Sequence, residues 1–156
     1  MSMLRRSLLV VLVASGLTYM AHAQQLQTFE KAEITIDTAA GSRRFSVELA
    51  VTPAQEEQGL MFRQRLAPDA GMLFVFGDTA VRTFWMKNTL IPLDMLFIAP
   101  DGRIVDIHER AVPLSEDVIP SREPARAVLE LNGGTAARLS IKIGDVVRYK
   151  SFGNAR

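Results

Sequence analysis

The sequence predicts a mainly β fold, an antiparallel β-sandwich or barrel of about eight strands with one or two short helices. Three observations predict it. Short segments of alternating or continuous apolar residues recur along the chain, turn signals separate them in place of long helical patterns, and only one clear helix start occurs. With 156 residues, of which 48% are hydrophobic, the chain has room for one domain with a sizeable core.

The first expected elements are a hairpin and a helix. Residues 32–37 and 44–51 each alternate apolar and polar side chains, and Gly41 lies in the turn between them. The sequence Thr-Pro-Ala-Gln at 52–55 has the pattern of a capping box with proline at the first helical position. We therefore expect a short helix over 53–60.

The middle of the chain predicts three further strands and a second hairpin. Residues 71–76 are continuously apolar, as in a strand buried on both faces. Residues 83–86 predict a strand, 87–92 a turn or bend, and 93–99 another strand. A Pro-Asp-Gly turn then joins this last strand to 104–109, which makes the clearest hairpin of the sequence.

The last part of the chain begins with a proline-rich segment. Residues 111–124 contain three prolines, and we expect an ordered surface loop that is able to cover a cleft. A strand over 127–131, one helical turn over 135–139 and a final strand over 146–152 complete the predicted domain.

The first 23 residues predict a secretory signal peptide. Two arginines at positions 5 and 6 precede an apolar run over 8–17, and Ala21-His22-Ala23 follows as a small-x-small cleavage site. The apolar stretch is shorter than the roughly 20 residues that span a bilayer. We therefore expect cleavage after Ala23, by the general secretory route rather than the twin-arginine route, and no stable membrane span in the product.

The predicted chain thus has three parts: a signal peptide over 1–23, a flexible leader over 24–31 and a single β domain over 32–153, located in the periplasm or secreted. Removal of the signal peptide leaves 16 basic and 17 acidic side chains, without a basic run. This balance argues against nucleic acid or an anionic membrane surface as the main partner. The absence of cysteine excludes thiol catalysis and cysteine-based metal sites.

Several motifs between Gly59 and Gly134 carry a family resemblance. They are Gly59-Leu60-Met61-Phe62-Arg63, Gly71-Met72-Leu73-Phe74-Val75-Phe76, Phe84-Trp85-Met86-Lys87-Asn88-Thr89, Ile91-Pro92-Leu93-Asp94 and Val128-Leu129-Glu130-Leu131-Asn132-Gly133-Gly134. With these motifs the chain closely resembles the bacterial and archaeal family called domain of unknown function number 192, over nearly everything after the predicted signal peptide. The resemblance implies a jelly-roll-like β fold with short helices and an exported or membrane-tethered protein, and it implies no reaction. One departure is Gly133, where the family more commonly has alanine.

The polar residues around the bend after the only tryptophan are the strongest candidates for a site. Lys87, Asn88 and Asp94 lie between apolar runs, where polar groups need partners. We expect the bend to bring them to one rim of the sheet, beside Arg63 and Glu130. Three interpretations of this set stay open. The residues bind a charged ligand by bidentate hydrogen bonds, or one carboxyl acts as a general acid or base. Alternatively, they form an internal ion-pair network that ties the bend to the sheet, with Asp94 or Glu130 capping exposed backbone amides.

Two further features bear on the site. We expect Trp85 to line a cleft that the loop over 111–124 covers. The four methionines after the signal peptide, Met61, Met72, Met86 and Met95, are able to bind Cu(I) through their thioethers, but we favour the interpretation that they fill gaps in the core. No metal and no cofactor are expected.

The function expected from the sequence is a non-enzymatic binding or accessory module of the cell envelope. Its ligand is an unknown small molecule or envelope component. The alternative is a hydrolase of an envelope polymer with Asp94 or Glu130 as general acid or base, which requires two carboxyls about 5 to 9 Å apart in an open groove. Copper binding by methionine is a more remote alternative.

Overall fold

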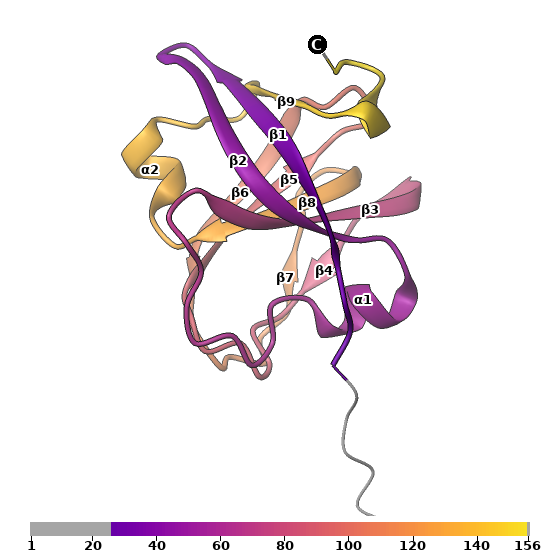
Figure 1. Ribbon diagram of the computed structural model, residues 1–156, viewed down its shortest axis with the longest axis vertical. Helices are drawn as coiled ribbons and strands as arrows, with labels where there is room; N and C mark the ends of the chain where they lie inside the picture. Colours follow the sequence, from indigo (N-terminus) through magenta and orange to yellow (C-terminus); the bar gives the residue numbers. More distant parts are fainter. Residues whose placement is uncertain (1–25, 156) are drawn as a thin grey trace, which may run out of the picture.

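A curled seven-stranded sheet forms the frame of the protein (Figure 1). The computed structural model describes residues 26–155, so the predicted signal peptide lies outside the described residues. The strand order in the sheet is β6-β5-β8-β3-β2-β1-β9. The strands span Glu30–Thr38 (β1), Gly41–Ala50 (β2), Ala70–Ala80 (β3), Leu93–Ile98 (β5), Ile104–Ala111 (β6), Ala125–Asn132 (β8) and Val146–Arg148 (β9).

Short elements complete the domain at one end of this sheet and along its edges. Strands β4 (Thr83–Phe84) and β7 (Ile119–Pro120) pair with each other in a second, two-stranded sheet. The helices are α1 (Pro53–Gln58) and α2 (Thr135–Leu139), and a 3₁₀ helix spans Lys150–Phe152. None of the helices in the described residues is long and apolar enough to cross a membrane.

The two edge strands of the large sheet come together at one end, which gives the sheet its curled shape. Arg103, just before β6, forms an antiparallel bridge with Val146 of β9. The amide of Ile104 donates to the carbonyl of Asp145 over 2.8 Å, and the amide of Val147 donates to Gly102 over 2.8 Å. The result is roughly a half-barrel whose edge strands are joined by hydrogen bonds.

This architecture confirms the predicted fold class. The fold is mainly β, with nine strands in residues 26–155 and two short α-helices. The β1–β2 and β5–β6 hairpins form as predicted, and Thr52 and Gln55 exchange the two hydrogen bonds of the capping box at the start of α1. Strand β1 begins at Glu30, inside the segment that we expected to be a leader.

Three elements differ from the sequence prediction. Strands β2 and β3 pair in parallel, because α1 and the segment after it return the chain to the same end of the sheet. Strand β4 stops at Phe84, since the next amides turn toward the loop over 111–124 and that of Met86 bonds to Ser115. Strand β9 stops at Arg148, and the predicted last strand ends in the 3₁₀ helix.

Two apolar clusters cover the two faces of the large sheet. The inner cluster fills the concave side with residues from β1, β2, β8 and β9, among them Phe45, Leu129 and Val147. The outer cluster, which includes Phe74 and Phe97, lies on the opposite face beneath α1 and the segment from β4 to β5. Alternation along β8 sends Leu129 to the inner cluster and Val128 to the outer one, so the side chain of Glu130 also belongs to the outer face.

Candidate functional site

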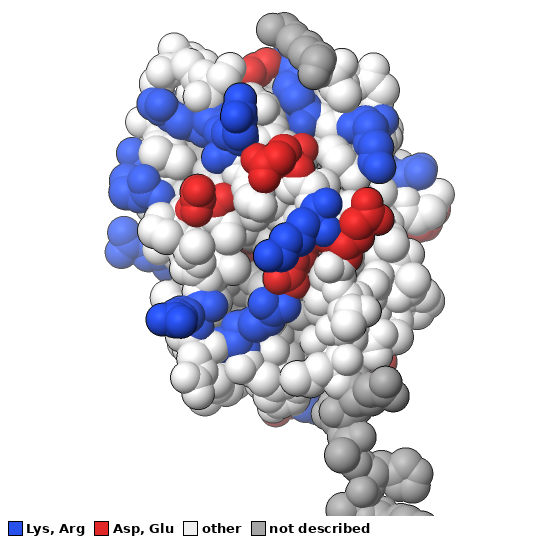
Figure 2. Space-filling view, in the orientation of Figure 1, with Lys and Arg blue, Asp and Glu red and all other residues white. Residues whose placement is uncertain are grey.

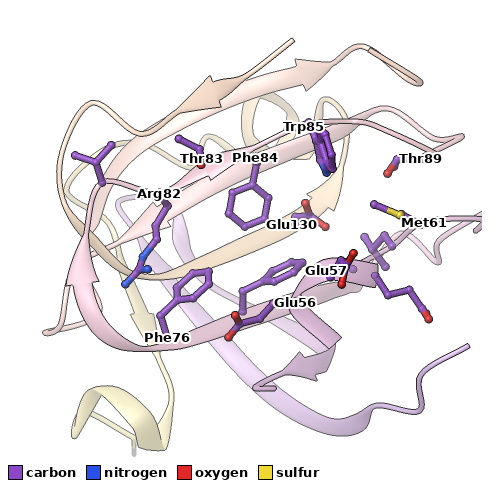
Figure 3. Close-up of a pocket in the computed structure, with 15 residues that line it drawn as sticks. Glu56, Glu57, Met61, Phe76, Arg82, Thr83, Phe84, Trp85, Thr89 and Glu130 are labelled. Carbon is purple, nitrogen blue, oxygen red and sulfur yellow. The ribbon is translucent and has the colours of Figure 1, made fainter. Parts of the chain in front are cut away.

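A cleft of about 340 Å³ opens over the outer cluster, between α1, the turn from β3 to β4, and strand β8 (Figure 3). Its lining holds four aromatic and four charged side chains: Phe74, Phe76, Phe84, Trp85, Glu56, Glu57, Arg82 and Glu130. This volume lies at the lower end of the range of ligand pockets, about 300–1,000 Å³. The cleft therefore suits a small molecule.

Glu130 is the central polar group of the cleft. Its neighbours across the sheet are Met72 on β3 and Met95 on β5, and both of these side chains are fully buried. Glu130 itself is only 4% exposed, and within residues 26–155 no hydrogen bond or ion pair reaches its carboxyl. Burial raises the pKa of Glu130 to about 8. At neutral pH the carboxyl group of Glu130 is therefore protonated.

Two glutamates reach the cleft from α1. The capping box at Thr52 fixes where α1 begins, and the crossover from β2 to β3 carries the helix over the outer face of the sheet. Glu56 and Glu57 follow in the first turns and line the cleft on the side opposite Phe84 and Trp85, with Glu130 between the two groups (Figure 3). Burial raises the pKa of the Glu56 carboxyl, and the nearby charge of Arg82 only partly opposes this rise.

Arg82 is the cation of the cleft lining, and other residues already bind it. Its guanidinium donates to the Asp78 carboxylate over 2.8 Å and to the carbonyl of Ala125 over 3.1 Å. The same group lies 4.0 Å from the ring centroid of Phe76, in a cation–π contact. The hydrogen bond and charge of Arg82 lower the pKa of Asp78. Within residues 26–155, only Nη1 of the Arg82 guanidinium thus keeps N–H donors that a ligand could use.

The aromatic side of the cleft is a packed wall with an exposed end. Phe84 meets Phe74 edge to face with ring centroids 5.1 Å apart, and it meets Phe97 at 6.2 Å. Trp85, next in sequence, lines the cleft but remains 43% exposed. The ammonium of Lys87 lies 4.9 Å from the centroid of the Trp85 ring system. The indole is thus in contact with both the cleft and a positive charge.

The structure does not bring the six predicted site residues to one point. Trp85 and Glu130 line the cleft, whereas Arg63, Lys87, Asn88 and Asp94 are not part of its lining. Asp94 is fully buried, and its carboxylate accepts from the amides of Arg110, Gly134 and Ala136 over 2.8–2.9 Å. This is the capping role that the sequence left open as an alternative, and no carboxylate oxygen of Asp94 remains without a donor.

Arg63 and Asn88 hold loops together. The two terminal guanidinium nitrogens of Arg63, Nη1 and Nη2, donate to the carboxylate of Glu48 at 3.1 and 2.6 Å. Asn88 adopts a left-handed backbone with φ of 55°, and its carbonyl accepts from the amide of Phe62 over 2.9 Å. A backbone hydrogen bond therefore ties the bend to the segment after α1, next to the cleft.

The four methionines lie on the outer face of the sheet. Met72, Met86 and Met95 are fully buried members of the outer cluster, and Met61 lines the cleft. The side chains of the first three fill the core, as we favoured from the sequence. Within residues 26–155, no group of three or more His, Cys, Asp or Glu side chains could hold a metal ion.

A family model matches the chain, and solved structures resemble it in sequence and fold. The DUF192 family model, described as "Uncharacterized ACR", matches residues 34–149. A crystal structure from Sinorhizobium meliloti 1021, described as a "putative transcription regulator", is 52% identical, with a TM-score of 0.78 over 81% of this chain and 99% of that one.

A second solved structure, a protein of unknown function from Novosphingobium aromaticivorans DSM 12444, is 44% identical. Its TM-score is 0.75, over 76% of this chain and 85% of that chain. Among curated proteins, none matches the chain significantly.

Proposed function

This chain belongs to the DUF192 family, and from the geometry of its cleft we propose that it is a non-enzymatic small-molecule binding domain of the cell envelope. The observation that carries the proposal is the carboxyl of Glu130. It lies at the cleft with 4% of its surface exposed and with no hydrogen-bond or ion-pair partner in residues 26–155. A buried carboxyl without a partner costs stability, and a ligand that bonds to it recovers that cost.

The location in the envelope rests on the sequence. The pattern of arginines, apolar run and Ala-x-Ala site in the first 23 residues supports export, and the β domain would then work in the periplasm or outside the cell. The near-balanced charge supports a small molecule over nucleic acid. Figure 2 shows Lys and Arg interspersed with Asp and Glu on the face in view, which is not the continuous basic surface that binds phosphate backbones.

A ligand screen with a matched variant tests the proposal. Envelope metabolites and glycans are added to the purified protein and to Glu130→Gln, and the melting temperature of each is followed. A specific ligand should raise the melting temperature of the wild type by mass action and have a much smaller effect on the variant. Ligands that stabilise both proteins equally would place binding away from this cleft and contradict the proposal.

Hydrolysis is a second candidate, and one observation favours it. A carboxyl with a pKa of about 8 keeps its proton at neutral pH, as a general acid must. Glu56 and Glu57 then offer a second carboxyl in the same cleft. Asp94 has no part in this version, because backbone amides occupy its carboxylate. Release of reducing ends from envelope polysaccharides, lost in Glu130→Gln, would support hydrolysis over simple binding.

A further inference from the structure

We propose that the ligand of the cleft is an organic cation, a primary or quaternary ammonium group carried on a small apolar body. The inference rests on the binding function proposed above and adds the chemical class of the ligand. It is argued from the charges, the aromatic rings and the size of the cleft.

The charges of the cleft are mostly acidic. Glu56 and Glu57 face it from α1 and Glu130 from β8, against one guanidinium, that of Arg82. Arg82 already bonds to the carboxylate of Asp78 at 2.8 Å. The cleft therefore has more carboxyl groups than cations to pair with them, and a ligand cation would supply the missing charge.

Glu130 is the group best placed to select a cation. Its neighbours in the sheet, Met72 and Met95, carry no charge, so nothing there compensates a carboxylate. In a site with little water an opposite charge at contact distance is worth far more than on the surface. When an ammonium group binds, the carboxyl proton of Glu130 leaves to solvent and the carboxylate pairs with the cation. Among the charged groups of the cleft lining, an anionic ligand would find only the Nη1 donors of Arg82, and the charge of that guanidinium is already paired with Asp78.

The aromatic lining fits the rest of such a ligand. Phe76, Phe84 and Trp85 offer ring surface that packs against methyl or methylene groups and attracts a positive charge. The structure already contains one example of this preference: the ammonium of Lys87 lies 4.9 Å from the Trp85 ring centroid. Lys87 is not part of the cleft lining, so the contact does not fill the cleft.

The size of the cleft limits the ligand to a small body. A volume of about 340 Å³ accommodates an amine with one ring or a choline-sized head group, and not a polymer segment. A bare metal ion is a poor fit, because no cluster of three or more His, Cys, Asp or Glu in the described part of the chain could ligate it.

Calorimetric titration of the purified protein with isosteric probes tests the inference. The cations are phenethylammonium and choline, the neutral isosteres are 2-phenylethanol and 3,3-dimethylbutan-1-ol, and 3-phenylpropionate is the anion. At least one cation should bind at least tenfold more tightly than its neutral isostere. Glu130→Gln should lose at least tenfold of that cation affinity, whereas Glu109→Gln, at an exposed glutamate of β6, should bind as the wild type does.

The outcomes separate this inference from the proposed function. Neutral or anionic probes that bind as tightly as the cations and lose affinity in Glu130→Gln would contradict the inference that the ligand is a cation. That result would still agree with the proposed binding function. No binding by any probe, together with no hit in the wider screen, would overturn both. If Glu130→Gln does not fold, Trp85→Leu replaces it. That exposed indole can be removed without opening the core, and its loss should weaken cation binding more than binding of the neutral isostere.

Discussion

The carboxylate of Asp94 accepts a hydrogen bond of 2.8 Å from the backbone amide of Ala136, a residue 42 positions further along the chain. The same carboxylate also accepts from the amides of Arg110 and Gly134. One buried side chain thus fixes the end of β6, the turn after β8 and the first turn of α2. The Asp94 carboxylate, which the sequence predicted at a candidate site, therefore holds three segments together by hydrogen bonds.

The substitution Asp94→Asn should destabilise the protein. One asparagine oxygen can still accept from Arg110 and Gly134, but the amide nitrogen would face the N–H of Ala136, where two donors meet. We expect a loss of about 2–4 kcal/mol in the free energy of unfolding, measured by urea denaturation.

The exposed Asp69→Asn is the control and should change stability by less than about 0.5 kcal/mol. An unchanged or raised stability of Asp94→Asn would contradict the capping role and return Asp94 to the candidates for a functional group.

Glu130 should make the protein less stable as the pH rises. Its pKa is raised by burial to about 8 in the folded protein, from an ordinary value of 4.5. Between these values the folded state holds a proton that the unfolded state has lost. The free energy of unfolding should therefore fall with rising pH, by up to about 1.4 kcal/mol per pH unit, and level off above the folded pKa.

Denaturation of the wild type and Glu130→Gln at pH 6, 7 and 8 measures this effect. Glu56, Glu57, Arg82 and Lys87, the charged groups around the cleft, are common to both proteins and largely cancel in the difference. At each increase in pH, the free energy of unfolding of Glu130→Gln should rise relative to that of the wild type. Parallel pH curves would mean that Glu130 is ionised in the folded protein at neutral pH.

The close contact of β3 with β8 depends on a glycine. A Cβ atom at Gly71 would lie 2.6 Å from the backbone oxygen of Glu130 and 2.8 Å from a methyl of Leu131. Because the nearer of the two atoms is a backbone oxygen, no rotation of a side chain relieves the contact, and the strands must separate. We expect Gly71→Ala to cost about 1–3 kcal/mol and to weaken ligand binding, since it displaces the backbone that carries Glu130.

Gly77 provides the matched control on the same strand. A Cβ there would meet no atom within 4 Å, so Gly77→Ala should stay within about 0.5 kcal/mol of the wild type. Similar melting temperatures for the two variants would show that β3 and β8 can move apart without a loss of stability.

The sequence predicts the local parts of the fold well and the long-range parts less well. The β1–β2 and β5–β6 hairpins follow from alternation and a turn, which lie within about twenty residues of each other. The parallel pairing of β2 with β3 has no such signal, because it depends on how α1 packs against the sheet. Strands β4 and β9 end earlier than predicted for a similar reason, because contacts with segments distant in the sequence determine where they end.

In the candidate site, too, the sequence indicates the residues with a local signal and misses those that depend on long-range packing. Trp85 and Glu130 stand out in the sequence as a lone indole and a charge within an apolar strand, and both line the cleft. Glu56 and Glu57 were missed, because two glutamates on a short helix are typical of a solvated surface. They reach the cleft only because the crossover from β2 to β3 places α1 above the outer cluster. The sequence around Glu56 and Glu57 has no pattern that indicates this packing, since the bend over 87–94 lies about thirty residues further along the chain.

Arg63 and Glu48 should act as a structural pair whose loss leaves ligand binding intact. Their two hydrogen bonds, of 3.1 and 2.6 Å, have the bidentate geometry that strengthens an ion pair. Both side chains are partly exposed, at 35% and 20%, so solvent screens the interaction. A double-mutant cycle with Arg63→Met and Glu48→Gln should give a coupling energy of about 0.5–1 kcal/mol.

The register of the sheet makes this pair a strict test of where the site lies. Glu48 is opposite Met72 on β3, and Met72 is opposite Glu130 on β8, so the pair is on the same face as the cleft but separated from Glu130 by a buried methionine. Any ligand found in the thermal screen should therefore bind Arg63→Met as tightly as it binds the wild type. A loss of affinity of tenfold or more in that variant would extend the site across Met72 to the Arg63 side of the sheet.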